Sequence, residues 1–352
     1  MKNFYNNKTV LITGHTGFKG SWLAEILSNW GSNVIGYSLE APTKPSLYSL
    51  LKLEERITSI HGDIRDYSLL EEVFQEHKPE IVIHMAAQPL VRESYKEPHY
   101  TYETNVMGTV NICECVRKSD FVKSFLNVTT DKVYENVEKS EGYSEDEKLD
   151  GFDPYSNSKS CSELVTHSYN NSFYKNMKIP CSTARAGNVI GGGDFATDRI
   201  IPDCVRAIEN NEDIIIRNPS SIRPYQHVLE SLNLYLIIMM KQFKDIEYAG
   251  YYNVGPDDSD CITTGDLTDL FCKYYRKYFD KDLKWINKSD NSVHEANFLK
   301  LDNSKIKDIF NWNVKWNIEE SVDKTLEWTY YYINDLNIKE CTDKQIEEYF
   351  KC

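Results

Sequence analysis

The sequence lacks the features of several protein classes. Its longest uninterrupted apolar run, Leu234 to Met240, is far too short to cross a bilayer. The nine cysteines are odd in number and include no C-x-x-C pair, so they predict neither a disulfide framework nor a zinc site. The few residues before Thr9 leave no room for a secretory signal sequence. We therefore expect a protein without metal, outside any membrane, in a reducing cytoplasm.

Positive charge is also scarce. The chain has 54 acidic and 40 basic residues, which gives a formal net charge of -14. Nucleic acids and anionic membranes attract basic proteins, so neither is expected as a partner. A small anionic ligand can still bind where cations gather locally. With 41% hydrophobic residues, a chain of 352 residues can bury a substantial core.

Short apolar runs bounded by turn residues alternate with longer amphipathic stretches along the first half of the chain. This alternation predicts an α/β fold, a Rossmann-type doubly wound parallel sheet covered by helices. The candidate strands are residues 9–13, 33–37, 57–61, 81–85, 124–129 and 181–186.

The alternation ends near the glycine-rich turn Gly191-Gly192-Gly193. We expect a main domain of residues 1–187 and a smaller, mostly helical C-terminal lobe of residues 188–352. Strand-like stretches near 225–255, at Gln226 to Leu229 and Tyr251 to Val254, are expected to return to the main domain.

A glycine-rich turn after the first predicted strand is the first chemical motif. Glycines spaced as Gly-x-x-Gly-x-x-Gly allow a tight turn, close approach of backbone to a pyrophosphate, and close packing of a helix expected to open at Ser21. A flexible turn is the alternative, but the strand before and the helix after favour a dinucleotide-binding domain. The residues of this predicted site are Gly14, His15, Thr16, Gly17, Phe18, Lys19 and Gly20.

One contact with a dinucleotide is missing from the sequence. In such folds an acid usually follows the second strand and binds the adenosine ribose. Here Tyr37-Ser38 occupies that place, and the nearest acid is Glu40. Without this acid, the sequence distinguishes less clearly between NAD and NADP. We also expect the cofactor to be loosely held.

The second motif, Tyr-x-x-x-Lys, occurs three times in this tyrosine-rich chain, at Tyr155–Lys159, Tyr48–Lys52 and Tyr174–Lys178. Only the first has a helix start in front of it, with Asp153 as N-cap and Pro154 as first helical residue. Tyr155 and Lys159 would then share one helix face. The helix N-terminus and the lysine cation are expected to lower the tyrosine pKa, so that Tyr155 can act as a base.

The third motif is Thr130-Asp131-Lys132, at the end of the strand that precedes this helix. Ligands of open parallel sheets bind beyond the carboxyl ends of the strands, so these side chains are expected to face the cofactor. A polar surface turn is the alternative. The glycine loop before it and Tyr155 after it favour an active site.

The order of these motifs resembles that of nucleotide-sugar 4,6-dehydratases, a family of extended short-chain dehydrogenases/reductases. Five segments are similar to those of family members that act on CDP-glucose. These segments are Gly14 to Trp22, Ala184 to Asp194, Arg199 to Pro202, Arg223 to Val228 and His294 to Leu301.

The resemblance implies NAD as cofactor and a redox-neutral 4,6-dehydration of a nucleotide-activated hexose. The expected substrate is CDP-D-glucose and the product CDP-4-keto-6-deoxy-D-glucose. A homodimer or higher homo-oligomer is implied as well. The family also implies cofactor contacts from Tyr155 and Lys159 and from Asp63, Ile64, Ala86, Ala87 and Gln88.

The resemblance further assigns roles in catalysis and substrate binding. Tyr155, steered by Lys159 and Thr130, would take the proton of the C4 hydroxyl, and Asp131 would protonate the departing C6 oxygen. Lys132 stands where many dTDP-glucose dehydratases have glutamate, so a neutral amine would be the C5 base. The diphosphate would contact Asn188, Arg199 and Arg223, with Gln88 and Arg92 as weaker candidates for sugar or phosphate contact.

Three other interpretations remain open. A nucleotide-sugar 4-epimerase would share Tyr155 but would need neither Asp131 nor Lys132. A dehydratase of another substrate, such as a UDP-N-acetylhexosamine or a UDP-, GDP- or dTDP-linked hexose or heptose, can carry the same motifs. A catalytically silent NAD-sensing scaffold is disfavoured because Tyr155 and Lys159 are both present.

Overall fold

The structure, a computed structural model, describes residues 1–288 and 298–351. Its centre is a sheet of seven parallel strands in the order β11-β6-β5-β4-β1-β2-β3. The predicted fold class and all six predicted strands are confirmed, with ends that differ by at most one residue. The strands are β1 (Thr9–Thr13), β2 (Asn33–Ser38), β3 (Thr58–His61), β4 (Ile81–His84), β5 (Ser124–Thr130), β6 (Cys181–Ala186) and β11 (Tyr251–Val254).

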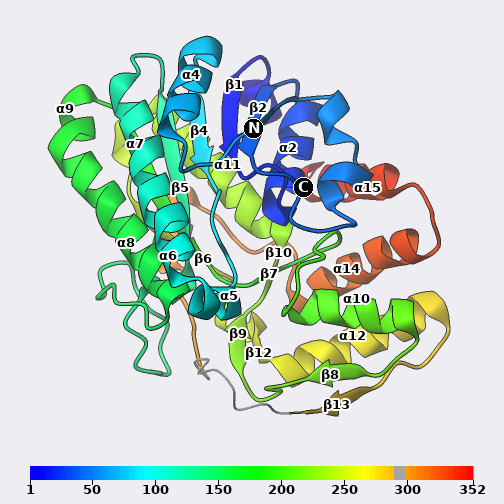
Figure 1. The fold of residues 1–352 in the computed structure, drawn as a ribbon. Coiled ribbons are helices and arrows are strands. Elements are labelled where there is room, and N and C mark those ends of the chain that lie inside the picture. The colour runs from blue at the N-terminus through cyan, green and yellow to red at the C-terminus, as the bar shows by residue number, and fades with distance from the viewer. Residues whose placement is uncertain (289–297, 352) are drawn as a thin grey trace.

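Helices cover both faces of this sheet (Figure 1). Because side chains alternate along a strand, Val10 and Ile12 of β1 pack into one core and Leu11 into the other. The first core is covered by α2 (Phe18–Asn29), α11 (Val228–Lys244) and α15 (Ile338–Lys351), and the second by α4 (Tyr67–His77), α7 (Gly108–Lys118) and α8 (Pro154–Tyr169).

A third core joins the elements that lie beyond the carboxyl ends of the strands. It is formed mainly by α10 (Ile200–Asn210), α12 (Thr264–Phe279) and α14 (Ile318–Ile333), with β8 (Ile214–Ile216) beside β13 (Trp285–Asn287). Two further short pairs are β7 (Val189–Ile190) with β10 (Gln226–His227), and β9 (Ile222–Pro224) with β12 (Cys261–Thr263). The remaining α-helices are α1 (Lys2–Tyr5), α3 (Leu47–Leu50), α5 (Val91–Lys96), α6 (Pro98–Tyr102), α9 (Lys175–Met177) and α13 (Ser304–Phe310).

The two stretches expected to return to the main sheet behave differently. Tyr251–Val254 is β11, the edge strand beside β6. Gln226–His227 instead pairs with β7, and Val228 and Leu229 already belong to α11, so the predicted extension of a strand to Leu229 is wrong. A strand was expected there because four residues are too few to show the helical period of α11. The division of the chain at residue 187 stays a prediction.

Within the described residues, no helix has both the length and the apolar character needed to cross a membrane.

Candidate active site

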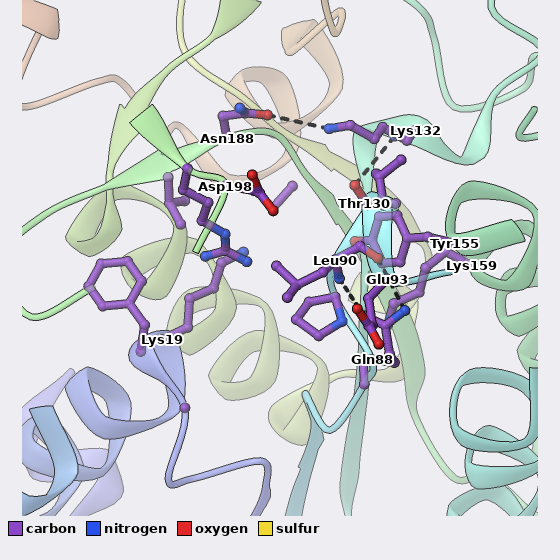
Figure 2. Close-up of a pocket in the computed structure, with 18 of the residues that line it drawn as sticks. Lys19, Gln88, Leu90, Glu93, Thr130, Lys132, Tyr155, Lys159, Asn188 and Asp198 are labelled. Carbon is purple, nitrogen blue, oxygen red and sulfur yellow. Dashed lines mark hydrogen bonds between the residues drawn. The ribbon is translucent and has the colours of Figure 1, made fainter. Parts of the chain in front are cut away.

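A cavity of about 1150 Å³ lies at the carboxyl ends of the parallel strands. Its walls come from the glycine loop, the ends of β2 to β6, the start of α8, and segments between residues 186 and 225. Figure 2 shows Lys19 on one side of this cavity and Tyr155 and Lys159 on the other. The predicted motifs therefore meet in one place, where parallel α/β sheets bind ligands.

The glycine loop is a backbone cradle in which side chains do not fit. Gly14 has φ +79°, and a Cβ there would lie 2.9 Å from the amide nitrogen of Ala86. A Cβ on Gly20 would lie 2.2 Å from the carbonyl oxygen of Gly14. The helix expected to open at Ser21 in fact begins at Phe18, with Gly17 as its N-cap, because Gly20 is helical and packs against the turn. Gly14, Thr16, Gly17, Phe18, Lys19 and Gly20 all line the cavity, as expected for a pyrophosphate site.

His15 is the one loop residue that does not line the cavity. Its ring is buried against Gly36, and its Nε2 lies 2.7 Å from the hydroxyl of Ser59. Burial lowers the pKa of His15 to about 4. The structure thus places a neutral imidazole beneath the loop, where it supports the turn and does not face a ligand.

The end of the cavity beside β2 and β3 contains Ser38, Glu40, Asp63 and Ile64. Where the ribose-binding acid is missing, the Ser38 hydroxyl lies 2.8 Å from the hydroxyl of Thr16. Hydrogen bonds from Arg65 hold the pKa of Asp63 below its usual range, so this carboxylate stays charged. Asp63 and Ile64, two of the predicted cofactor contacts, both line the cavity.

Ala86, Ala87 and Gln88 follow β4 and line the cavity. The side chain of Gln88 is largely occupied: its amide nitrogen donates to Leu90 and to Thr101, and its oxygen accepts from the Leu90 amide at 2.6 Å. Gln88 therefore fixes the segment before α5, and its side chain is a poor candidate for contact with a sugar. Arg92, on α5, lines the same wall.

Thr130, Asp131 and Lys132 lie at the end of β5, as predicted, and all three line the cavity. The Thr130 hydroxyl donates to Asp131 Oδ1 at 2.9 Å, and Lys132 Nζ lies 3.4 Å from the same oxygen. Lys132 Nζ also lies 3.4 Å from Asn188 Oδ1 (Figure 2). Asp131 Oδ2 is buried and has no hydrogen-bond partner among the described residues.

Of the three Tyr-x-x-x-Lys motifs, the one selected from the sequence is the one whose tyrosine lines the cavity. Asp153 caps α8 by accepting from the Ser156 amide at 3.0 Å, and Pro154 is the first residue of the helix. Tyr155 lines the cavity. Tyr48 instead donates to Ser59, and Tyr174 donates to the Cys113 carbonyl in the core.

The predicted direction of the Tyr155 pKa is wrong for this structure. Burial raises it to about 12, and the hydrogen bond with Thr130 and the charge of Arg199 only partly offset that rise. Lys159 Nζ donates to the carbonyl of Val128 at 3.2 Å, and burial lowers its own pKa to about 8. Burial outweighs the local helix and lysine effects because the phenol is almost fully enclosed.

Glu163, one turn after Lys159, belongs to the surroundings of the site although the motifs did not reveal it. Its buried carboxylate accepts from Thr183 at 2.8 Å and from Arg185 at 3.0 Å. Its charge raises the pKa of Lys159, against the larger effect of burial. An arginine in the middle of a buried strand, such as Arg185 in β6, is the sequence signal for such a partner.

The predicted diphosphate ligands come from segments after β6. Arg199 is the N-cap residue of α10 and forms an ion pair with Asp194 at 3.0 Å. Arg223 is buried in β9, and its Nη1 donates to the Ile222 carbonyl at 2.9 Å. Asn188, Arg199 and Arg223 all line the cavity. Of the segment His294 to Leu301, residues 294–297 lie outside the described residues, and Leu299 lines the cavity.

Comparison with known proteins places these features in a family context. The profile of the GDP-mannose 4,6 dehydratase family matches residues 11–325. The chain is 44% identical to CDP-glucose 4,6-dehydratase of Salmonella typhimurium, over 99% of this chain and 98% of that protein. It is 26% identical to CDP-paratose 2-epimerase of Salmonella typhi, over 91% of this chain and 98% of that protein.

Solved structures share the fold. UDP-glucose 4-epimerase of Thermotoga maritima, with UDP-glucose, has a TM-score of 0.76 at 23% identity, over 93% of this chain and 99% of that one. dTDP-glucose 4,6-dehydratase of Bacillus anthracis, in complex with NAD, has a TM-score of 0.74 at 21% identity, over 93% of this chain and 97% of that one.

Proposed function

Since the chain belongs to the GDP-mannose 4,6 dehydratase family, we propose that it is an NAD-dependent dehydratase that converts CDP-D-glucose to CDP-4-keto-6-deoxy-D-glucose. The choice of CDP-glucose is supported by 44% identity to a CDP-glucose 4,6-dehydratase over 99% of the chain. The observation that carries the reaction type is the meeting of Tyr155 with Asp131 and Lys132 in one cavity. A 4-epimerase would need only the tyrosine.

The residues present fit NAD. A side chain at Gly14 or Gly20 would collide with neighbouring backbone, so both glycines are needed for the tight turn that a pyrophosphate-binding loop requires, and the cavity runs from them to Tyr155. When bound, NAD supplies an acceptor for the C4 hydride and returns that hydride to C6. NAD is expected to be bound least well at the ribose end of the cavity, because Ser38 stands where an acid usually binds the adenosine ribose.

Tyr155 is the proposed base for the C4 hydroxyl. Burial keeps its phenol protonated at neutral pH, with a pKa of about 12. The Thr130 hydrogen bond and the positive charge of Arg199 favour the phenolate. Lys159, fixed by the Val128 carbonyl and held charged by Glu163, keeps a cation one helical turn away. The phenol must first lose its own proton to solvent; the resulting phenolate, which these groups favour, can then take the proton of the C4 hydroxyl.

Asp131 and Lys132 are the proposed acid and base of water loss. A keto group at C4 acidifies the C5 hydrogen, which Lys132 takes as a proton while the bond from C6 to its oxygen breaks. Asp131, in its protonated form, gives a proton to that oxygen, which leaves as water. Tyr155 has gained one proton from the sugar and Asp131 has lost one, so proton exchange with solvent restores both groups after the cycle. Lys132 then returns its proton to C5 as C6 receives hydride. Asp131 Oδ1 and Asn188 Oδ1, both near Lys132 Nζ, stabilise the ammonium formed in between.

A substrate panel tests the proposal. Purified protein is incubated with CDP-, UDP-, GDP- and dTDP-hexoses and NAD+, and mass spectrometry follows the loss of one water. CDP-glucose is expected to be dehydrated fastest. Faster turnover of another nucleotide would overturn the substrate, and an isomer of unchanged mass would indicate an epimerase.

We also propose that the protein works in the cytoplasm as a homodimer or higher homo-oligomer. Exposed apolar side chains on helices beside the sheet, among them Leu164 of α8 and Met107 before α7, support self-association. Light scattering coupled to size exclusion checks this, with a monomer at micromolar concentration as the contrary result.

A further inference from the structure

Lys19, the second residue of α2, is the one charged side chain of the glycine loop. It lines the cavity, and its Nζ lies 3.5 Å from the hydroxyl of Tyr235 and 5.9 Å from that ring's centre. Among residues 1–288 and 298–351, no carboxylate forms an ion pair with it. A half-buried cation whose contacts are with a neutral phenol lacks a charged partner.

The charges around Lys19 explain which kind of ligand would suit it. The charges with the largest effect on its pKa are those of the cations Arg199, Lys159 and Lys132 and the carboxylate Asp131. Asp131 already contacts Thr130 and Lys132, and Asp194 pairs with Arg199. The charges with the largest effect on Lys19 thus comprise three basic side chains and one carboxylate, a local excess of basic groups inside a protein whose formal net charge is -14. An anion would balance this excess.

Two diphosphates could supply that charge, the pyrophosphate of the dinucleotide and the diphosphate of the sugar nucleotide. The neighbours of Lys19 favour the second. Tyr235 belongs to α11 and Arg199 to the start of α10, both after residue 187, and the other charges are those of the catalytic motifs. The four charges with the largest effect on the Lys19 pKa all lie away from the ribose end, where Glu40 and Asp63 are found.

We propose that Lys19 and Arg199 together bind the diphosphate of the sugar nucleotide, so that this lysine of the cofactor loop serves the substrate. This proposal rests on the proposed function only in taking the substrate to be a sugar nucleotide. It replaces the sequence-based prediction that Lys19 contacts the dinucleotide. The helix N-terminus still offers its backbone N–H groups to the cofactor, while the side chain of its second residue reaches across the cavity.

A pH dependence follows from the position of Lys19. Burial, with the charge of Arg199 as second cause, lowers its pKa to about 7; Asp131 opposes this, while Lys159 and Lys132 add to it. Tyr235 is the facing group on α11. A bound diphosphate raises the pKa again, so above pH 7 binding must take up a proton. The dissociation constant should therefore rise with pH above 7, by at most about tenfold per unit.

The test measures binding without turnover. Calorimetry on protein freed of dinucleotide gives the Kd of CDP-, UDP-, GDP- and dTDP-sugars and, separately, of NAD+. For the sugar nucleotide that the wild type binds best, Lys19→Met should raise Kd about 10- to 100-fold, the loss of one charge-assisted contact. The Kd of NAD+ should change less than threefold. Lys281→Met, at an exposed position outside the cavity, is the matched control.

Lys19→Arg separates charge from structure. Arginine stays protonated, so the variant should bind at pH 7 and lose the pH dependence centred near pH 7, while a change centred near pH 8 would belong to Lys159. If Lys19→Met weakens NAD+ and leaves the sugar nucleotide unchanged, the lysine belongs to the cofactor and our inference is wrong, while the dehydratase proposal stands. If the wild type binds no sugar nucleotide at all, both fail.

Discussion

The two ends of the cavity are built from different parts of the chain. At the glycine-loop end, backbone and small residues form the surface, and substitutions at Gly14 or Gly20 would meet backbone atoms within 3 Å. At the other end, ionisable side chains from three segments converge, at the end of β5, the start of α8 and the start of α10, and burial and neighbouring charges affect their protonation. Backbone shape determines ligand binding at the glycine-loop end, and side-chain charge determines it at the other end. The two ends should therefore respond differently to mutation and to pH.

The largest effect is expected at the charged end, from Tyr155→Phe. Without the phenol, no neighbouring group replaces the base, and turnover should fall by about 10² to 10⁴. NAD+ affinity should change little, because the glycine cradle is intact. Steady-state turnover and calorimetric NAD+ binding measure the two effects.

Tyr48→Phe is the matched control, since Tyr48 also heads a Tyr-x-x-x-Lys motif but donates to Ser59 outside the cavity. It should retain near-normal turnover. If the two variants behaved in the reverse order, our choice among the three motifs would be wrong.

A step-specific effect is expected from Asp131→Asn. The amide can hydrogen-bond but gives up no proton at useful cost, so water loss should slow by about 10² to 10⁴ while C4 oxidation persists. Reduced dinucleotide and a 4-keto-hexose should therefore accumulate in a single turnover, followed by near-ultraviolet absorbance and mass spectrometry.

Lys132→Met tests the same step from the other side, because it removes the proposed C5 base. Exchange of the C5 hydrogen with deuterated water should disappear in this variant but persist in Asp131→Asn. Normal dehydration by Asp131→Asn, with no absorbance transient, would place the acid elsewhere.

Local sequence was enough for the strands and for predicting that Tyr155 lies at the start of a helix. Buried parallel strands are continuous apolar runs between turn residues, so their ends were visible within one residue. Asp153 and Pro154 distinguished Tyr155 from two chance motifs because capping is a local property.

What local sequence could not supply were effects of three-dimensional burial. The direction of the Tyr155 pKa, the inward ring of His15, and the use of Gln88 as a structural amide all depend on segments distant in the chain. Lys19 is the clearest case. A lysine in a loop is usually exposed to solvent, whereas Lys19 lies beside Tyr235 of α11 and is affected by Arg199 at the start of α10.

The smallest effect is expected at the cradle end, in how tightly NAD is held. With Ser38 in place of an acid, one ribose contact is absent, worth about 1 kcal/mol or less than tenfold in affinity. Added NAD+ should therefore raise the activity of purified protein several-fold, and dialysis should leave less than one dinucleotide per chain.

Glu40 lines the same end of the cavity, so Glu40→Gln tests whether it acts as the missing acid. If it does, the variant needs more NAD+ to reach half-maximal activity, while its affinity for the sugar nucleotide is unchanged. A stoichiometric dinucleotide that survives extensive dialysis would contradict loose binding, and a strong preference for NADP+ would contradict the cofactor. Either result would show that side-chain charge matters at both ends of the cavity, and the contrast between the ends would fail.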